Sequence, residues 1–135
     1  MNKKIKVLIV DDENTICLLL KTYLERLGFE TFVATNGEKA LDILEEENPA
    51  IMTLDIRMPG LNGYELLQKV KRRYPELFII VITGIDVPNM EEMLEHSGAH
   101  ALLRKPIDLQ ELSDIICGFV GICGTPILNK GEEDG

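Results

Sequence analysis

The sequence has few cysteines and few basic residues, and each of these two shortages argues against a class of protein. The three cysteines, Cys17, Cys117 and Cys123, have the spacing of neither a metal site nor a disulfide framework. We therefore expect reduced thiols and a cytoplasmic location. Only 14 lysines and arginines stand against 23 acidic residues, giving a formal net charge of -9. That balance argues against direct nucleic-acid binding and against a polybasic membrane-surface protein.

Long hydrophobic runs are also missing. The most apolar stretch, residues 77–85, is interrupted by Thr83 and Gly84 and is far shorter than the roughly 18 residues of a membrane-spanning helix. The first residues contain no apolar stretch typical of a signal peptide. With 45% hydrophobic and 27% charged residues in 135 positions, the composition is typical of one globular domain.

Short β-type runs alternate with helical stripes along most of the chain. Runs of apolar and β-branched residues predict strands at residues 5–10, 29–34, 51–54, 78–82 and 101–104. Apolar residues at helical spacing predict a helix after each strand, with stop signals at Gly28, Pro49, Pro75, Gly98 and Gly121. This alternation favours a doubly wound α/β fold with a parallel sheet. We expect one domain over residues 1–120, followed by a flexible tail or the start of a linker at residues 121–135.

The reactive side chains of the sequence all follow predicted strands. They are Asp11 and Asp12, Asp55, Thr83, and Lys105, after the first, third, fourth and fifth strands respectively. Because parallel strands bring their carboxyl ends to one edge of the sheet, we expect these groups to lie together. Mutually repelling carboxylates suit a divalent ion such as Mg²⁺, and a lysine beside them can neutralise a phosphoryl oxygen. The set favours phosphoryl transfer to an aspartate.

Four motifs, in this order, make the chain resemble the receiver domain of two-component response regulators. They are VLIVDDE at residues 7–13, LDIRMPGLNGYE at 54–65, VITG at 81–84, and the pair Lys105-Pro106. The resemblance extends from Lys4 to about Val120. It implies a flavodoxin-like (βα)5 sheet with strand order 2-1-3-4-5, and a cis bond between Lys105 and Pro106.

The resemblance also implies a role for each site residue. Asp55 would be the phosphoacceptor, Lys105 would contact the phosphoryl group, and Thr83 would move towards it as the switch. Four ligands would hold Mg²⁺: Asp11, Asp12, Asp55 and the backbone carbonyl of Arg57. Leu102 stands where the family usually has an aromatic residue, so we expect the switch to depend on Thr83 and the backbone after it.

The implied function is signalling rather than substrate turnover. A histidine kinase or a histidine phosphotransfer protein would supply the phosphoryl group, and no enzyme activity is expected beyond self-phosphorylation from small donors and autodephosphorylation. A downstream protein would bind the face formed by the predicted helix 88–98, the strand 101–104 and the last helix. The chain would act as a monomer or as a phosphorylation-dependent homodimer.

Several alternatives remain open at this point. The chain could be a receiver excised from a larger hybrid kinase or regulator, with residues 121–135 as the linker. A phosphatase of the haloacid dehalogenase type would also place an aspartate after a strand, but it needs a second acid where this chain has Arg57. A flavin carrier of the same topology and a degenerate receiver that only binds partners are the remaining possibilities.

Overall fold

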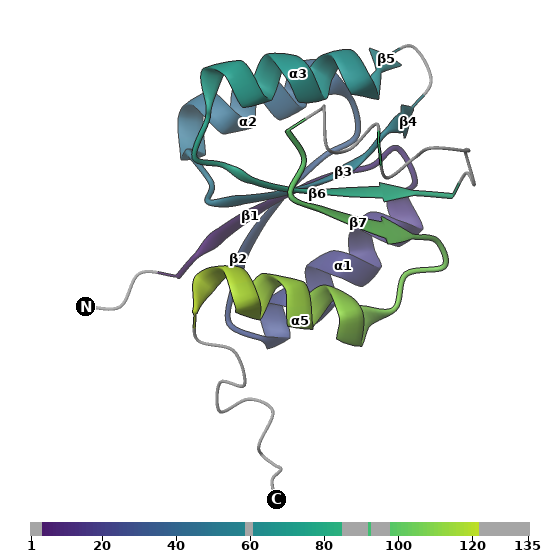
Figure 1. Ribbon diagram of the computed structural model, residues 1–135. Helices are drawn as coiled ribbons and strands as arrows, with labels where there is room; N and C mark the ends of the chain where they lie inside the picture. Colours follow the sequence, from purple (N-terminus) through teal and green to yellow (C-terminus); the bar gives the residue numbers. More distant parts are fainter. Residues whose placement is uncertain (1–3, 59–60, 85–91, 93–97, 122–135) are drawn as a thin grey trace, which may run out of the picture.

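A parallel sheet forms the centre of the protein (Figure 1). The computed structural model describes residues 4–58, 61–84, 92 and 98–121. Five strands form the sheet: β1 (Lys6–Val10), β2 (Glu30–Ala34), β3 (Ile51–Asp55), β6 (Phe78–Thr83) and β7 (Ala101–Arg104). They lie in the order β2-β1-β3-β6-β7, which is 2-1-3-4-5 when they are counted along the chain. The predicted doubly wound fold and its strand order are confirmed.

Helices cover both faces of the sheet. α1 (Asn14–Arg26) and α5 (Leu109–Val120) lie on one face, and α2 (Gly37–Glu47) and α3 (Gly63–Arg73) lie on the other (Figure 1). Among the described residues, no helix has the length and hydrophobicity needed to cross a bilayer.

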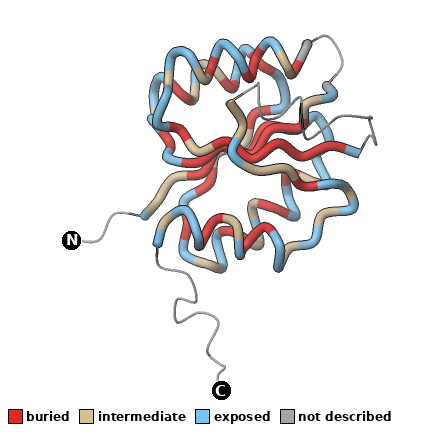
Figure 2. Tube along the Cα trace, viewed as in Figure 1, coloured by how far each residue is buried: buried red, intermediate tan, exposed pale blue. Residues whose placement is uncertain are grey.

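The hydrophobic core is divided by the sheet into two clusters. In β1, Val7 and Ile9 pack with α1 and α5, whereas Leu8 and Val10 pack with α2 and α3. Successive strand residues point to opposite faces, so a strand covered on both sides must be apolar throughout. This explains the nearly unbroken apolar run in the sequence. Figure 2 shows buried positions along the strands and on the helix sides that face them.

The helix ends follow the signals in the sequence. The Asn36 side chain accepts a hydrogen bond of 2.8 Å from a backbone N–H in the first turn of α2. Asp108 accepts bonds of 2.9 and 3.2 Å from two such groups in α5. Gly28 and Gly121 follow α1 and α5 with φ of 100° and 76°, the left-handed conformation that ends a helix most easily at glycine.

The structure contains one element that the sequence did not predict, and two predicted segments lie outside the residues that it describes. A two-stranded antiparallel ribbon of β4 (Arg57–Met58) and β5 (Leu61–Asn62) connects β3 to α3. Strands of two residues have no periodicity that a sequence could reveal. The predicted helix at 88–98 falls almost wholly outside the described residues, as does the predicted tail after Gly121.

Gly63, the first residue of α3, lies directly against the backbone of Ile56. A Cβ at this position would collide with the Ile56 carbonyl oxygen and would lie 2.7 Å from the Ile56 Cα. Ile56 in turn donates its backbone N–H to the carbonyl of Ile82 in β6 at 3.3 Å. The start of α3 and the chain just after Asp55 can therefore approach this closely only because residue 63 lacks a side chain.

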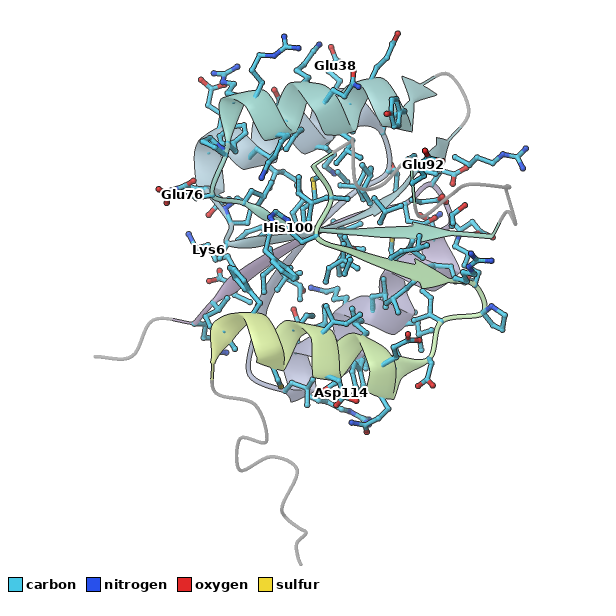
Figure 3. All side chains as sticks on the ribbon, in the orientation of Figure 1. Lys6, Glu38, Glu76, Glu92, His100 and Asp114 are labelled. Atoms are coloured by element: carbon cyan, nitrogen blue, oxygen red, sulfur yellow. The ribbon has the colours of Figure 1, made fainter. Side chains whose placement is uncertain are left out.

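His100, just before β7, lies beside β6 (Figure 3). The ring Nδ1 accepts the backbone N–H of Ile79 at 3.1 Å, and the backbone N–H of His100 donates to the Ile79 carbonyl at 2.8 Å. The ring also stacks on Phe78, with the centroids 4.9 Å apart. Burial and, secondarily, the charge of Lys71 lower the pKa of His100. A protonated Nδ1 could not accept the Ile79 bond.

We expect the protonation of His100 to reduce stability in mild acid. Because the folded state favours the neutral ring, the unfolded chain binds more protons as the pH falls through the ordinary pKa of 6.5 and below. The free energy of unfolding should therefore decrease over this range, and it should decrease less in His100→Asn, which does not titrate. Urea unfolding of both proteins at several pH values measures the difference. Equal pH dependence in the two proteins would contradict the assignment.

Candidate functional site

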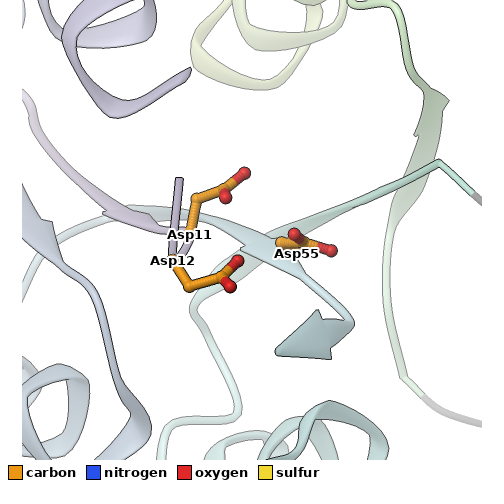
Figure 4. A group of neighbouring side chains, drawn as sticks. All are labelled: Asp11, Asp12 and Asp55. Carbon is orange, nitrogen blue, oxygen red and sulfur yellow. The ribbon is translucent and has the colours of Figure 1, made fainter. Parts of the chain in front are cut away.

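Three carboxylates meet at the carboxyl edge of the sheet (Figure 4). Asp11 and Asp12 directly follow β1, and Asp55 ends the neighbouring strand β3. One oxygen from each side chain lies within 4.8 Å of the others. Asp11 and Asp55 are buried, with 2% and 4% of their surface exposed, whereas Asp12 is exposed. The sheet thus brings together the acids that the sequence placed after different strands.

Backbone hydrogen bonds orient the two buried carboxylates. Asp11 Oδ1 accepts the N–H of Glu13 at 2.9 Å, and Asp55 Oδ1 accepts the N–H of Arg57 at 3.0 Å. The second oxygen of Asp55 accepts a bond from Lys105 Nζ at 3.2 Å. The second oxygen of Asp11 is buried and has no hydrogen-bond partner among the described residues. A buried anionic oxygen without a donor is costly unless a cation lies beside it.

The Lys105 ammonium is the cation nearest to these acids among the described residues. Its Nζ lies 3.3 Å from Asp11 Oδ2, 3.2 Å from Asp55 Oδ2 and 2.7 Å from Glu13 Oε1. Partial burial opposes the charge on Lys105, but the bonds to Glu13 and Asp55 and the charge of Asp11 outweigh it and raise the pKa. Lys105 is therefore held as a cation. The bond from Lys105 to Pro106 is cis, as the resemblance implied.

The shortest of these contacts, to Glu13, was not predicted from the sequence. Glu13 is exposed over 56% of its side chain, whereas Asp11 and Asp55 are almost fully buried. The only signal available was its position directly after Asp11 and Asp12, at the end of the same strand. The structure therefore places a third, solvent-accessible partner on the lysine.

Burial disfavours the charged form of Asp11. It is the main reason why the pKa of Asp11 is raised, and the nearby charge of Asp55 raises it further, although the Glu13 N–H and Lys105 act in the opposite direction.

The Cys17 thiol donates to the Asp11 carbonyl at 3.2 Å. Burial, together with the charges of Asp11 and Asp12, raises its pKa to about 11. Cys17 is therefore a protonated, unreactive thiol at neutral pH.

Thr83 and Arg57 both lie close to Asp55 in the fold: Thr83 ends β6, the neighbour of β3, and Arg57 comes two positions after Asp55. Thr83, the last residue of β6, is fully buried, one position beyond the partner of Asp55 in the ladder between β3 and β6. Its carbonyl accepts the backbone N–H of Lys105 at 2.9 Å, which connects the ends of β6 and β7. Arg57 is exposed and belongs to β4. Every residue predicted for the site lies at this edge of the sheet.

Leu102 occupies the position where the sequence departs from the family pattern. Leu102, in β7, pairs with Val81 of β6 and is half-buried against the core cluster on the side of α2 and α3. An aliphatic side chain there has no aromatic ring to turn between two positions. The replacement of the usual aromatic residue by Leu102 therefore changes the packing of the core as well as the motif.

The donor set fits a hard divalent cation. Three carboxylates supply only oxygen atoms, and the buried second oxygen of Asp11 forms an ion pair with Lys105 at 3.3 Å but no hydrogen bond among the described residues. Mg²⁺ prefers such oxygen ligands, usually takes one or two carboxylates from the protein, and retains places for water or phosphate. The arrangement suits a reaction in which an anionic group approaches Asp55.

Comparisons with known proteins agree with this geometry. Residues 7–117 match the response regulator receiver domain. Sporulation initiation phosphotransferase F of Bacillus subtilis is 36% identical over 111 residues, which are 82% of this chain and 90% of that protein. The probable transcriptional regulator ycf27 of Cyanophora paradoxa is 36% identical over 136 aligned positions, which cover 100% of this chain but only 56% of that regulator.

Solved structures show the same likeness. The CheY-like response regulator receiver domain protein from Methanospirillum hungatei has a TM-score of 0.83 at 28% identity, over 88% of this chain and 95% of that one. A putative response regulator from Chloroflexus aurantiacus has a TM-score of 0.80 at 29% identity, over 88% of this chain and 99% of that one.

Proposed function

The chain belongs to the response regulator receiver family of two-component signalling, and on this basis we propose that it accepts a phosphoryl group on Asp55 in a Mg²⁺-dependent reaction. The proposal rests chiefly on one observation. Asp55 Oδ2 lies 3.2 Å from the Lys105 ammonium, which also contacts Asp11, so the candidate acceptor already has a cation at its side. Receiver domains generally bind Mg²⁺ at an acidic pocket, and the cluster of Asp11, Asp12 and Asp55 supports the same role here.

In the proposed reaction, a carboxylate oxygen of Asp55 attacks the phosphorus of a phosphohistidine. An O–P bond forms as the P–N bond breaks, and the donor imidazole leaves with its electron pair. The backbone N–H of Arg57 holds Asp55 Oδ1 and so fixes the orientation of the carboxylate. Mg²⁺, held by Asp11, Asp12, Asp55 and the carbonyl of Arg57, would supply positive charge to the transferred oxygens.

Lys105 and Thr83 would then stabilise the product. The Lys105 ammonium, now on Asp55 Oδ2, would contact a phosphoryl oxygen instead, and the Thr83 hydroxyl would donate to another. Both residues end strands that are joined by the hydrogen bond from Lys105 N–H to the Thr83 carbonyl. A movement of Lys105 or Thr83 towards the phosphoryl group would therefore change the conformation of the face formed by β7 and α5.

The partners follow from this chemistry. We expect a histidine kinase or a histidine phosphotransfer protein as donor, and a downstream protein that binds the helix at 88–98 together with β7 and α5. We place the receiver domain at residues 1–120, as a monomer or a phosphorylation-dependent homodimer without enzyme activity beyond its own phosphorylation and dephosphorylation. Buried free thiols at Cys17 and Cys117 support a cytoplasmic location.

A second candidate is that the chain is the receiver part of a longer regulator. The Cyanophora relative aligns with the whole chain but is only 56% covered by it, and a second ycf27 regulator, from Porphyra purpurea, is 45% covered. This alternative changes the downstream partner but not the chemistry at Asp55.

Phosphorylation from a small donor tests the proposal. The purified chain is incubated with acetyl phosphate, with Mg²⁺ or with a chelator, and its intact mass is measured. We expect the mass to increase by one phosphoryl group only with Mg²⁺, and hydroxylamine, which cleaves acyl phosphates, to reverse the gain. No mass gain would support a degenerate receiver. Continuous turnover of a phosphomonoester would instead support the phosphatase alternative.

Glu13→Gln should accelerate this reaction. In the resting protein Glu13 holds the Lys105 ammonium at 2.7 Å and so competes with an incoming phosphoryl group. An exposed ion pair contributes up to about 1 kcal/mol, which corresponds to an increase in rate of up to about fivefold. The initial rate of labelling by acetyl phosphate is the measurement. Glu46→Gln, an equally conservative change at the far end of α2, is the control, and an unchanged or slower rate in Glu13→Gln would contradict the expectation.

A further inference from the structure

A groove opens at the amino ends of the strands, at the end of the sheet opposite Asp55. Its walls are the loops that precede β3 and β6 and the last turn of α5, and its volume is about 560 Å³. We name it the basal groove and define it by its apolar lining: Pro49, Tyr74, Pro75, Leu77 and Phe119. No residue of the proposed phosphorylation site contributes to it.

Phe119 forms a rigid wall of the basal groove. Its ring stacks on Phe78 with the centroids 4.2 Å apart, and Phe78 stacks on His100. Although it is packed in this way, Phe119 is 41% exposed and lines the groove, so part of its aromatic surface remains accessible there. An apolar surface of this kind in a concave site is typical of a place where another apolar group binds.

The chain itself supplies an apolar segment close to this wall. Residues 122–135, ICGTPILNKGEEDG, begin just three positions after Phe119 and contain the consecutive apolar residues Pro126, Ile127 and Leu128. Leu128 lies seven positions after Gly121, and when extended this stretch of chain spans roughly 23 Å. Since Phe119 already lines the basal groove, these residues are long enough to enter it directly from the end of α5.

We propose that Pro126, Ile127 and Leu128 bind in the basal groove of the same chain. Because the segment is covalently attached beside the groove, its effective concentration is far higher than that of a second molecule in dilute solution. Side chains of both charge signs, for example Arg73 and Glu76, also line the groove, so its charge favours neither an acidic nor a basic segment. The proposal concerns the end of the molecule opposite Asp55 and does not depend on phosphorylation.

Hydrogen exchange in the groove wall tests the proposal. The backbone N–H groups of Leu77 and Phe78 donate to Tyr74 and Ala50 at 3.0 Å each, and they report on local opening of the two loops. We compare exchange in residues 73–78 between the full chain and a chain that ends at Gly121. We expect exchange to be slower in the full chain by roughly tenfold, as when the bound state is about ten times as populated as the free state.

Two full-length variants make the test specific. Ile127→Asp combined with Leu128→Asp should remove the protection, because two charges cannot enter an apolar groove. Thr125→Asp combined with Asn129→Asp adds the same charge at polar positions of the segment and should retain it. Since both variants keep the entire chain, they remain informative even if the truncated chain unfolds.

Three results would overturn the proposal. One is equal exchange in the full chain and in the Ile127→Asp/Leu128→Asp variant. A second is equal loss of protection in both double variants, which would indicate a general effect of charge. The third is protection that rises with protein concentration, together with a dimer in sedimentation velocity, because a second copy would then occupy the groove.

Discussion

Asp55→Asn should reduce phosphorylation by acetyl phosphate by at least about a hundredfold, to the background of the assay. The amide nitrogen and carbonyl oxygen of asparagine are far poorer nucleophiles than a carboxylate. The substitution also brings an uncharged group to the place where Asp55 Oδ2 meets the Lys105 ammonium. Asparagine can still accept the backbone N–H of Arg57 through its Oδ1, so the loop after β3 should keep its conformation.

Asp42→Asn is the matched control for this experiment. Asp42 is an exposed carboxylate on α2 that belongs to neither the acidic cluster nor its contacts, so the Asp42→Asn protein should be labelled as much as the unchanged protein. Intact mass measures the extent of labelling, and peptide mapping locates the phosphoryl group. A mass gain that persists in Asp55→Asn, on a different residue, would move the acceptor elsewhere and refute the proposed site.

Gly63→Ala should destabilise the fold by about 3 kcal/mol, the upper range for an overpacked site. The new Cβ would overlap the carbonyl oxygen of Ile56, which is backbone and cannot rotate away. Relief therefore requires α3 or the segment after Asp55 to move, and Ile56 is held by its bond to the Ile82 carbonyl at 3.3 Å. The midpoint of urea unfolding, with the slope held constant, gives the change in free energy.

Gly118→Ala provides the opposite result in the same protein. Gly118 lies inside α5, and a Cβ there would meet no atom within 4 Å. Removing a glycine from a helix interior should stabilise the protein by about 0.5–1 kcal/mol. If Gly63→Ala were as stable as the unchanged protein, the contact between α3 and Ile56 would be deformable, and the rigid positioning of the chain after Asp55 would not hold.

The sequence was most informative where local chemistry and strand position coincide. The run from Val7 to Val10 is apolar throughout because both faces of β1 are covered, so it was recognisable as a central strand. Asp11, Asp55 and Lys105 could be assigned to one edge because parallel strands end there, whatever the details of their packing.

Features that depend on distances between side chains could not be predicted. The bond from Lys105 to Glu13 joins residues 92 positions apart and depends on the rotamers of two long side chains. Nothing in the sequence near Gly63 indicates that Ile56 approaches it so closely. The basal groove likewise arises where two loops and the end of α5 meet, so no single segment encodes it.

The two ends of the sheet offer separate surfaces to other molecules. The candidate acceptor stands at the carboxyl end of β3, whereas α5 ends near the groove at the amino end of the strands. A strand of five residues separates the two ends by roughly 17 Å. Cargo fused after Gly121, such as a fluorescent reporter or an output module, would therefore leave the molecule on the side away from Asp55. A donor could dock at one end while that cargo remained attached at the other.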